Sequence, residues 1–334
     1  MILVTGGTGL VGSHLLFDLV KKGENIRALK RENSSLQDVR NCFAYYSDSA
    51  DELFDKIEWV NGDMLDTDSL DEALKGISRV YHCAALVSFK KADKKLMKNI
   101  NIEGTRNIVD ACIGAKIEKL CFVSSVAALG TPEEKEDIVS ETTPWSPEDK
   151  RSDYSISKFN SELEVWRGIE EGLDAVIVNP SIILGPGQWH KGSSLLFTTV
   201  AKGMKYFTRG ITGYVDVRDV SKAMVQLMDS NIKNQRFLLN ADSCSYEFIL
   251  KSIAKALNLP EPSKYATPLM TGIAWRLAYL KKIFLFKEPS FTKATARSSH
   301  NRTFFSNQKI KDALGFEFIS VEKCIKDTAK HYSR

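Results

Sequence analysis

Residues 2–12 decide the fold, and they read Ile2-Leu3-Val4-Thr5-Gly6-Gly7-Thr8-Gly9-Leu10-Val11-Gly12. The apolar, β-rich run at 2–5 predicts a buried parallel strand. The apolar residues that follow recur at helical spacing and stop at Gly23, which predicts a helix directly after the glycines. A strand, a glycine-rich turn and a helix in this order are typical of the first unit of a dinucleotide-binding sheet.

The glycines of this turn have separate structural tasks. Gly6 or Gly7 makes the tight turn, Gly9 lets the backbone approach a pyrophosphate, and Gly12 lets the helix pack closely on the strand. The amides at a helix N-terminus attract anions, so we expect them to face the phosphates. Coincidence is the minor alternative, because the glycines lie between a strand and a helix. The predicted cofactor contacts here are Gly6, Gly9, Leu10, Val11 and Gly12.

Strand and helix patterns alternate through most of the chain. Further strands are predicted at 25–29, 57–61, 79–83, 120–123, 175–178 and 236–240. This order predicts an α/β fold with a Rossmann-type, doubly wound parallel sheet. The stretch from Tyr214 to Val220 is predicted to open a helix, capped by Asp216 or Asp219. After residue 240 the pattern is mainly helical, so we expect a smaller, mostly helical C-terminal substrate domain. The expected dinucleotide-binding domain comprises 1–178 and about 212–240, and the substrate-binding domain 179–211 and 241–334.

The composition excludes several classes of protein. The chain has 334 residues, 43% hydrophobic and 26% charged, which is enough for one large or two modest domains. A net charge of +4 argues against a dedicated nucleic-acid-binding protein. The six cysteines form no Cys-x-x-Cys pair, so we expect free thiols in a reducing, cytoplasmic compartment and predict no metal ligands. We expect no secretory signal and no stable membrane insertion.

Basic residues around the end of the second strand bear on the choice of cofactor. An NAD-selective site usually offers an acid there for the ribose 2′-hydroxyl. This chain has Arg27, Lys30 and Arg31 instead, with no acid before Glu32. These cations would attract a 2′-phosphate, so NADP(H) is favoured, with NAD as the alternative. The other interpretation is that the three side chains simply face solvent.

Further cofactor contacts are predicted where later strands end. Asp63 follows the third strand, where its carboxylate can accept from the adenine amino group, and Met64 can pack on the ring. Ala84 and Ala85 follow the fourth strand, where small residues let the backbone pass close to a cofactor. Pro180 breaks the sixth strand near the expected nicotinamide end. The remaining predicted cofactor contacts are Ser124, Ser181 and Ile183.

The stretch Asp153-Tyr154-Ser155-Ile156-Ser157-Lys158 carries the predicted chemistry. It lies in a helix expected from Ser152 to Glu171, so Tyr154 and Lys158 share one helix face. A nearby ammonium lowers the pKa of a phenol, which can then exchange a proton with an alcohol or ketone. For a lone Tyr-x-x-x-Lys, a surface pair on an amphipathic helix is the commoner interpretation. The rest of the chain reverses these odds.

Two polar residues from other segments are expected near this pair. Ser125 follows the fifth strand, at the ligand-binding edge of a parallel sheet, and could hold a substrate oxygen against the Tyr154 phenol. The alternative is a turn serine that bonds the local backbone. Asn101 lies in a helix expected at 96–114, where asparagine is unfavourable unless it packs closely or has a polar role.

The stretch from Met270 to Phe286 is unusually apolar. Arg276, Lys281 and Lys282 interrupt it, so it is not expected to span a membrane. We expect a core helix of the smaller domain. Interfacial membrane contact, or the mouth of a pocket for an apolar substrate, is the minor alternative.

The order of motifs along the chain resembles the extended short-chain dehydrogenase/reductase family, also called the NAD(P)-dependent epimerase/dehydratase family. The resemblance covers essentially the whole chain. It implies a seven-stranded parallel Rossmann core with a smaller, discontinuous substrate domain. The motifs that carry it are Gly6, Gly9, Gly12, Asp63, Ser125, Tyr154 and Lys158.

The resemblance also implies a role for each site residue. Tyr154 would be the catalytic acid and base, and Lys158 would lower its pKa and hold the nicotinamide ribose. Ser125 would orient the substrate, with Ser124 as its neighbour. Asn101 is similar to the structural asparagine of the family, which lies behind Lys158. The segment Pro180-Ser181 is similar to the one that contacts the cofactor carboxamide.

Within the family, the chain resembles ketone reductases most. The sugar 4,6-dehydratases carry Thr-Asp-Glu near the active serine, whereas this chain has Ser125-Val126-Ala127. Asn179-Pro180-Ser181 and Gly185-Pro186-Gly187 resemble the dihydroflavonol-4-reductase-like and 3β-hydroxysteroid-dehydrogenase-like members. We therefore expect an NADP(H)-dependent oxidoreductase that acts on a carbonyl, or on the matching alcohol, of a small, apolar, ring-bearing substrate.

Two other functions stay open, a nucleotide-sugar epimerase with tightly bound NAD and a non-catalytic NAD(P)-sensing protein. Family resemblance also implies a homodimer through the helices at 96–114 and 152–171.

Overall fold

The central feature is a seven-stranded parallel sheet. The computed structural model describes residues 1–132, 138–146, 151–285 and 292–332. The strand order is β11-β7-β5-β4-β1-β2-β3, and every neighbouring pair is parallel. The predicted doubly wound α/β fold is therefore confirmed, with each strand within two residues of its expected limits. The strands are β1 Ile2–Thr5, β2 Ile26–Lys30, β3 Ile57–Asn61, β4 Arg79–His82, β5 Lys119–Val123, β7 Ala175–Pro180 and β11 Gln235–Leu239.

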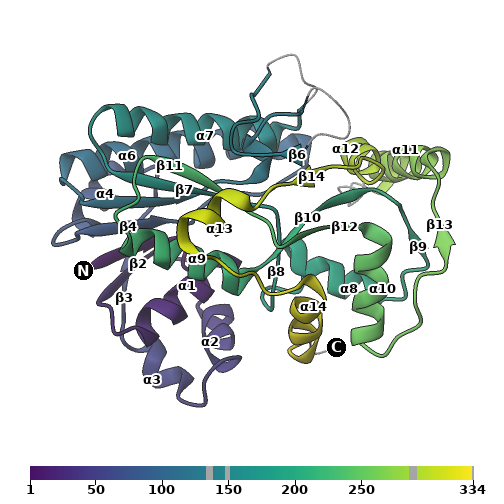
Figure 1. Ribbon diagram of the computed structural model, residues 1–334, viewed down its shortest axis with the longest axis horizontal. Coiled ribbons are helices and arrows are strands. Elements are labelled where there is room, and N and C mark those ends of the chain that lie inside the picture. The colour runs from purple at the N-terminus through teal and green to yellow at the C-terminus, as the bar shows by residue number, and fades with distance from the viewer. Residues whose placement is uncertain (133–137, 147–150, 286–291, 333–334) are drawn as a thin grey trace.

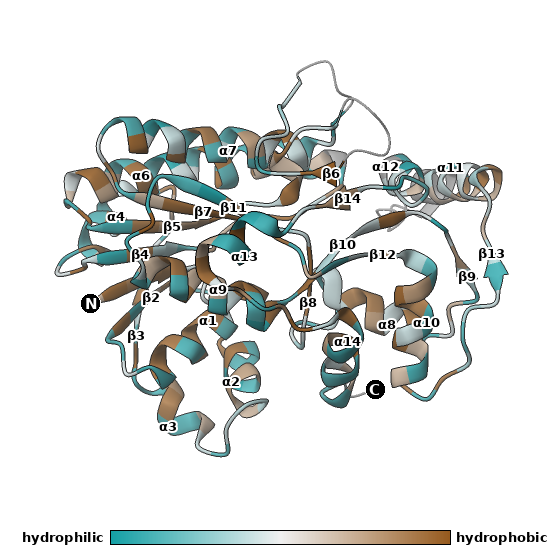
Figure 2. Ribbon diagram, in the orientation of Figure 1, coloured by the Kyte–Doolittle hydropathy of each residue, from teal (hydrophilic) through white to brown (hydrophobic). Residues whose placement is uncertain are grey.

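Helices cover both faces of this sheet (Figure 1). Alternate strand residues pack into two separate cores, because successive side chains of a strand point to opposite faces. Val4 and Val176 contribute to one core and Leu3 and Phe122 to the other. Since both faces are buried, the strands are apolar almost throughout (Figure 2). The helices of the first face are α1 Leu10–Lys21, α2 Gln37–Ala44, α3 Ala50–Phe54 and α9 Val217–Asp229; those of the second are α4 Thr67–Ala73, α6 Gly104–Gly114 and α7 Asp153–Glu170.

A second, smaller core lies beyond the carboxyl edge of the large sheet (Figure 1). Its three-stranded sheet has the order β12-β10-β8, and two pairs of short strands lie beside it, β13 with β9 and β14 with β6. The strands are β6 Ile138–Val139, β8 Ile182–Leu184, β9 Tyr206–Phe207, β10 Ile211–Asp216, β12 Asp242–Ser245, β13 Lys264–Tyr265 and β14 Phe304–Phe305. The helices of this core are α8 Leu195–Ala201, α10 Tyr246–Ala256 and α14 Val321–Lys330. The helices α11 Pro268–Leu285 and α12 Lys293–Ser298 pack against each other, whereas α13 Gln308–Leu314 packs against β11 and places Ile310 in the first core of the large sheet.

The segment around Tyr214 holds the predicted helix start and also a strand that was not predicted. The helix begins at Val217, and Asp216, one of the two predicted caps, accepts a hydrogen bond from the amide of Arg218 at 2.8 Å. The strand β10 runs up to Asp216 and pairs with β8 and β12 of the small sheet. β10 therefore belongs with the small sheet, whereas α9 and β11 belong with the large one. The predicted domain limits otherwise stay a prediction.

The apolar stretch predicted as a core helix forms α11, but much of it faces outward. Ile273, Leu277 and Tyr279 are 50%, 54% and 54% exposed, so the interpretation as a buried core helix is wrong for these side chains. Residue 286, the predicted end of the stretch, lies outside the described residues. Across the part of the chain that the structure describes, no helix combines the length and apolar character needed to cross a bilayer.

Candidate active site

The glycine turn has the geometry that its sequence predicts. Gly6 adopts a φ of +70°, and a Cβ at this position would lie 2.5 Å from the amide nitrogen of Ala84. Gly6 is therefore the residue of the tight turn, since only glycine adopts this backbone without strain. A Cβ on Gly12 would lie 2.2 Å from the Gly6 carbonyl oxygen, so the helix can approach the strand only with glycine there. These contacts explain both glycines.

The N-terminus of α1 fits a diphosphate. Gly9 is its N-cap and makes no side-chain capping bond, and the first turn holds no acidic residue. The free amides of a first turn and the helix dipole both favour an anion. The turn lies between β1 and β4, where the strand order reverses, and this is where open parallel sheets bind ligands. Leu10 and Val11 are the residues whose amides would hold such a group.

The cations around β2 do not all lie together. Arg27 lies early in the strand, pairs with Glu58 at 2.9 Å, and donates to the backbone carbonyls of Ala73 and Lys75. The prediction that Arg27 binds a 2′-phosphate is therefore corrected, because these partners already occupy its guanidinium. Lys30 ends the strand with its ammonium 2.6 Å from Asn61, and Arg31 is exposed directly after it.

The predicted adenine-side residues lie in different surroundings. Asp63 is exposed, and its carboxylate accepts from the amide of Leu65 at 2.9 Å. Met64 is 9% exposed and packs in the core of the second sheet face, so it is largely covered. Ala84 packs against the Gly6 turn, and Ala85 is exposed beside it.

Tyr154 and Ser125 meet at the carboxyl edge of the sheet. Ser152 caps α7 through the amide of Ser155, which fixes the first turn that carries Tyr154. The Ser125 side chain lies near enough to the Tyr154 hydroxyl to lower the pKa of the phenol. Ser125 Oγ also accepts from the amide of Ala127 at 3.1 Å, so the alternative of a turn-forming serine is true at the same time. The two predicted residues are thus brought together.

Lys158 is buried one helical turn further on. It is 2% exposed, and its ammonium donates to the Val123 carbonyl at 2.8 Å and lies 4.5 Å from the centre of the Phe122 ring. Burial lowers the pKa of Lys158 to about 8, although Glu162 and Cys83 act in the opposite direction.

The pKa of Tyr154 does not follow the prediction. Burial raises the pKa of Tyr154, and the Ser125 side chain only partly opposes this effect. The expectation that Lys158 lowers this pKa is therefore not met in the structure. Desolvation of the phenol outweighs the favourable contacts that a phenolate would make, so Tyr154 is held as a neutral phenol.

Asn101 connects the loop after β4 to α7. It lies in a π-helical turn, Asn99–Glu103, between α5 Lys94–Lys98 and α6. Its Oδ1 accepts from the Leu86 amide at 2.7 Å, and its Nδ2 donates to the Leu86 carbonyl and to Ser157 Oγ, both at 3.0 Å. Single π-turns are frequent at functional sites. Asn101 makes these contacts away from the Tyr154 hydroxyl, which is the geometry of a positioning residue.

Sequence reasoning missed a buried carboxylate behind the site. Glu162 is 2% exposed and accepts from Ser124 Oγ at 2.6 Å, Asn179 Nδ2 at 2.8 Å and Arg236 Nη1 at 2.9 Å. The Ser124 hydroxyl therefore bonds the interior, and its predicted contact with the cofactor stays a prediction. The missed signal was the spacing, because Tyr154, Lys158 and Glu162 recur every fourth residue on one helix face.

The end of β7 presents buried oxygen atoms at the same edge. Among the described residues, Asn179 Oδ1 and Ser181 Oγ have no hydrogen-bond partner. Pro180 ends the strand, and the Ser181 amide donates to the Leu239 carbonyl at 2.9 Å. Ile183 is half-buried in β8. Unpaired buried polar atoms are rare, so these two oxygens fit a site that a polar ligand completes.

A phenol, a serine hydroxyl and a lysine beside an uncapped glycine turn define a class. They match in type and order the residues expected of a short-chain dehydrogenase/reductase, and they lie at the edge where such a fold binds a dinucleotide.

Comparison with known proteins narrows this class. The model of the NAD dependent epimerase/dehydratase family matches residues 2–239. Sterol demethylase protein B of Methylococcus capsulatus is 32% identical, and the match covers 97% of this chain and 96% of the relative. A putative dihydroflavonol 4-reductase of Synechocystis is 28% identical over 97% of this chain and 92% of its own. The crystal structure of gox2253 has a TM-score of 0.81 at 28% identity, covering 99% and 97% of the two chains.

The chain therefore belongs to the NAD dependent epimerase/dehydratase family, the extended short-chain dehydrogenase/reductases, and is an NAD(P)-dependent enzyme. The resemblance read from the sequence is confirmed. The roles of the individual site residues stay predictions.

Proposed function

We propose that the protein is an NADP(H)-dependent oxidoreductase that reduces a carbonyl of a small, apolar, ring-bearing substrate or oxidises the matching alcohol. The observation that carries the proposal is the half-buried Tyr154 phenol, which has the Ser125 side chain near its hydroxyl and Lys158 one helical turn away. The nicotinamide cofactor, when bound, supplies or takes the hydride. The protein's own residues orient the reactants and move the proton.

Tyr154 is the proton donor in the reducing direction. Its raised pKa keeps the phenol protonated near neutral pH, where it can donate to the substrate oxygen as negative charge develops there. Ser125 holds the same oxygen beside the phenol, and its own position is fixed by the amide of Ala127. In the oxidising direction the phenol must first lose its proton, so alcohol oxidation is favoured by alkaline pH.

Lys158 and Asn101 prepare the site. Lys158 would hold the nicotinamide ribose through ammonium hydrogens other than the one bonded to Val123. Asn101 fixes the loop at Leu86 against α7 through Ser157, which lies between Tyr154 and Lys158 in the helix.

The preference for NADP(H) rests on Lys30 and Arg31. These cations end β2 where an NAD-selective site would offer an acid to the ribose 2′-hydroxyl. Arg31 is exposed and available for a 2′-phosphate, through charge-assisted hydrogen bonds. Arg27 no longer supports the preference, since Glu58 holds it.

An apolar substrate is supported by Phe89. Its ring lies edge-on to Tyr154 with the ring centres 5.7 Å apart, and the side chain is 54% exposed. An apolar ring is thus presented beside the reacting hydroxyl. Relatives named dihydroflavonol 4-reductase and cinnamoyl-CoA reductase support reduction as the direction. All six cysteines are free thiols, which supports the cytoplasmic location that we propose.

A homodimer through α7 is part of the proposal. Ile156 and Leu163 are 43% and 46% exposed and lie seven residues apart on one helix face. Size-exclusion chromatography with light scattering tests it, and a monomer at micromolar concentration would contradict it.

Titration of NADPH and NADH fluorescence tests the cofactor, and oxidation of the preferred one by a panel of ketones and aldehydes tests the reaction. Tyr154→Phe should keep cofactor binding and lose turnover by orders of magnitude. Near-normal turnover in this variant would refute the role of Tyr154. An epimerase would instead retain NAD tightly and consume no NADPH.

A further inference from the structure

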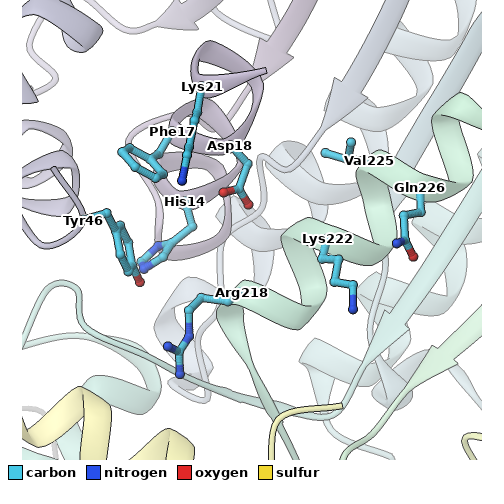
Figure 3. A pocket seen from close by; sticks show the side chains of 9 residues that line it. All are labelled: His14, Phe17, Asp18, Lys21, Tyr46, Arg218, Lys222, Val225 and Gln226. Carbon is cyan, nitrogen blue, oxygen red and sulfur yellow. The ribbon is translucent and has the colours of Figure 1, made fainter. Parts of the chain in front are cut away.

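A cavity lies between α1, α9 and Tyr46. Its volume is about 550 Å³. Figure 3 shows side chains of α1 and α9 facing each other across it, with the Tyr46 ring and Arg218 near His14. None of the predicted catalytic or cofactor-binding residues lines it. The cavity is thus a separate feature of the dinucleotide-binding half.

His14 presents an unused hydrogen-bond acceptor here. Its Nδ1 lies 2.8 Å from the Leu10 carbonyl, which can only accept, so Nδ1 carries the hydrogen and Nε2 is left as an acceptor. Burial lowers the pKa of His14 to about 4, so the ring is neutral near pH 7. Nε2 is buried and finds no hydrogen-bond partner in the described part of the chain.

Gln226 offers a second acceptor on the α9 side. Its Oε1 is also buried, and no residue that the structure describes donates to it. Buried polar groups are normally hydrogen-bonded, so two unpaired acceptors in the wall of one cavity indicate a missing donor. A hydroxyl or amino group on a ligand would supply it.

The charged residues of the cavity are mostly basic. Lys21 and Lys222 are exposed, and neither forms an ion pair with any residue in the described ranges. Arg218 is already held by Asp216 at 2.6 Å and Asp327 at 3.2 Å. The single acid, Asp18, accepts from Ser221 at 2.5 Å. Lys21 acts on Asp18 and Lys222 on Asp219 only beyond ion-pair distance, and Lys222 Nζ also lies 4.6 Å from the centre of the Phe316 ring. Both ammonium groups therefore keep hydrogens with which to bind an anion.

Aromatic side chains complete the lining. The Tyr46 ring lies edge-on to His14 with the ring centres 5.5 Å apart and 5.1 Å from that of Phe17. Flat apolar surfaces of this kind favour a ring. We propose that this cavity binds a small, ring-bearing anion that carries a hydroxyl or amino donor, with the donor on His14 Nε2 or Gln226 Oε1 and the anionic group on Lys21 and Lys222. This inference is independent of the proposed function.

4-Hydroxybenzoate is a suitable probe, because it has a ring, a hydroxyl donor and a carboxylate. Benzoate lacks the donor and 4-hydroxybenzyl alcohol lacks the charge. Calorimetric titration of the full chain, saturated with NADPH, should show saturable binding of 4-hydroxybenzoate that is at least tenfold tighter than that of either analogue. Lys222→Glu should weaken it at least tenfold. Lys255→Glu, an exposed change on α10, should leave it unchanged.

Nitrogen NMR of the histidine rings separates this cavity from the active site. The Nε2 resonance of His14, assigned through a His14→Asn variant, should move when 4-hydroxybenzoate is added and stay in place with benzoate. Absence of saturable binding would overturn the proposal. So would equal affinity in the Lys222→Glu protein, or binding that leaves the His14 signal in place.

Discussion

Replacement of Lys158 by methionine should stabilise the protein at pH 7 while it removes most of the activity. The side chain is 2% exposed, and burial lowers its pKa from the usual 10.5 to about 8. The pKa in the folded protein is thus about 2.5 below the usual value, which destabilises the folded protein by about 3 kcal/mol at pH 7, because one unit of pKa is worth about 1.4 kcal/mol. Methionine fills similar space without a charge. Loss of the hydrogen bond to the Val123 carbonyl destabilises the variant by about 1 kcal/mol, so a net stabilisation of about 2 kcal/mol is expected.

The pH dependence of stability independently tests whether the charged Lys158 destabilises the folded protein. Between pH 8 and 10.5 the unfolded lysine binds more protons than the buried one, so this group makes the wild-type protein more stable as pH rises through that window. The methionine variant lacks this contribution. Its advantage at pH 7 should therefore shrink above pH 8 and reverse at about pH 9.5, because about 1.4 kcal/mol is lost per pH unit.

Urea unfolding of the full chain at pH 7, 8, 9 and 10 measures this difference, with Lys255→Met on the exposed face of α10 as the matched control. The control should change stability by less than about 0.5 kcal/mol at every pH. The reasoning is refuted if Lys158→Met is less stable than the wild type at pH 7, or if the difference does not depend on pH. NADPH oxidation with the identified carbonyl substrate should fall at least a hundredfold in the variant.

Three further changes test other parts of the site. Glu162→Gln should cost about 3 kcal/mol in urea unfolding, because one amide oxygen cannot serve the donors that converge on the carboxylate, while exposed Glu170→Gln should be neutral. Arg31→Glu should weaken the binding of NADPH far more than that of NADH in fluorescence titrations. Arg27→Met should leave the preference for NADPH unchanged and lower stability, because Arg27 is paired with Glu58. The reverse pattern would show that Arg27, and not Arg31, binds the 2′-phosphate. Asn101→Ala should lose about 2–3 kcal/mol and speed hydrogen exchange at the Leu86 amide, and unchanged exchange would exclude the proposed positioning role.

Local features of the fold could be predicted from the sequence. The glycine turn depends on residues within ten positions of one another, so the roles of Gly6 and Gly12 could be predicted without tertiary information. Helix caps are local in the same way: Ser152 caps the helix that was expected to start there, and Asp216 caps the helix for which it was predicted. The continuous apolar runs of the strands also predict that both faces of the sheet are buried.

Features that depend on partners distant in sequence could not be predicted. Arg27 looked available because its partner Glu58 is 31 residues away and faces it only once β2 and β3 pair. The strand β10 was not predicted, because its pairing with β8 and β12 depends on residues distant in sequence. The raised pKa of Tyr154 reflects burial, which helical spacing alone does not report. Desolvation outweighs the charge that the sequence places nearby.

The π-turn at Asn99–Glu103 makes the length of this helix critical. It accommodates one residue more than an α-turn, and each residue of an α-helix turns the chain by about 100°. Deleting a single residue there would let an unbroken α-helix form, yet it would swing everything upstream by more than a quarter of a revolution. Lys94 would leave Asp153, to which it is now bound at 2.9 Å, and the amide of Asn101 would point away from Leu86. Shortening this segment by one should therefore be more harmful than most single substitutions within it.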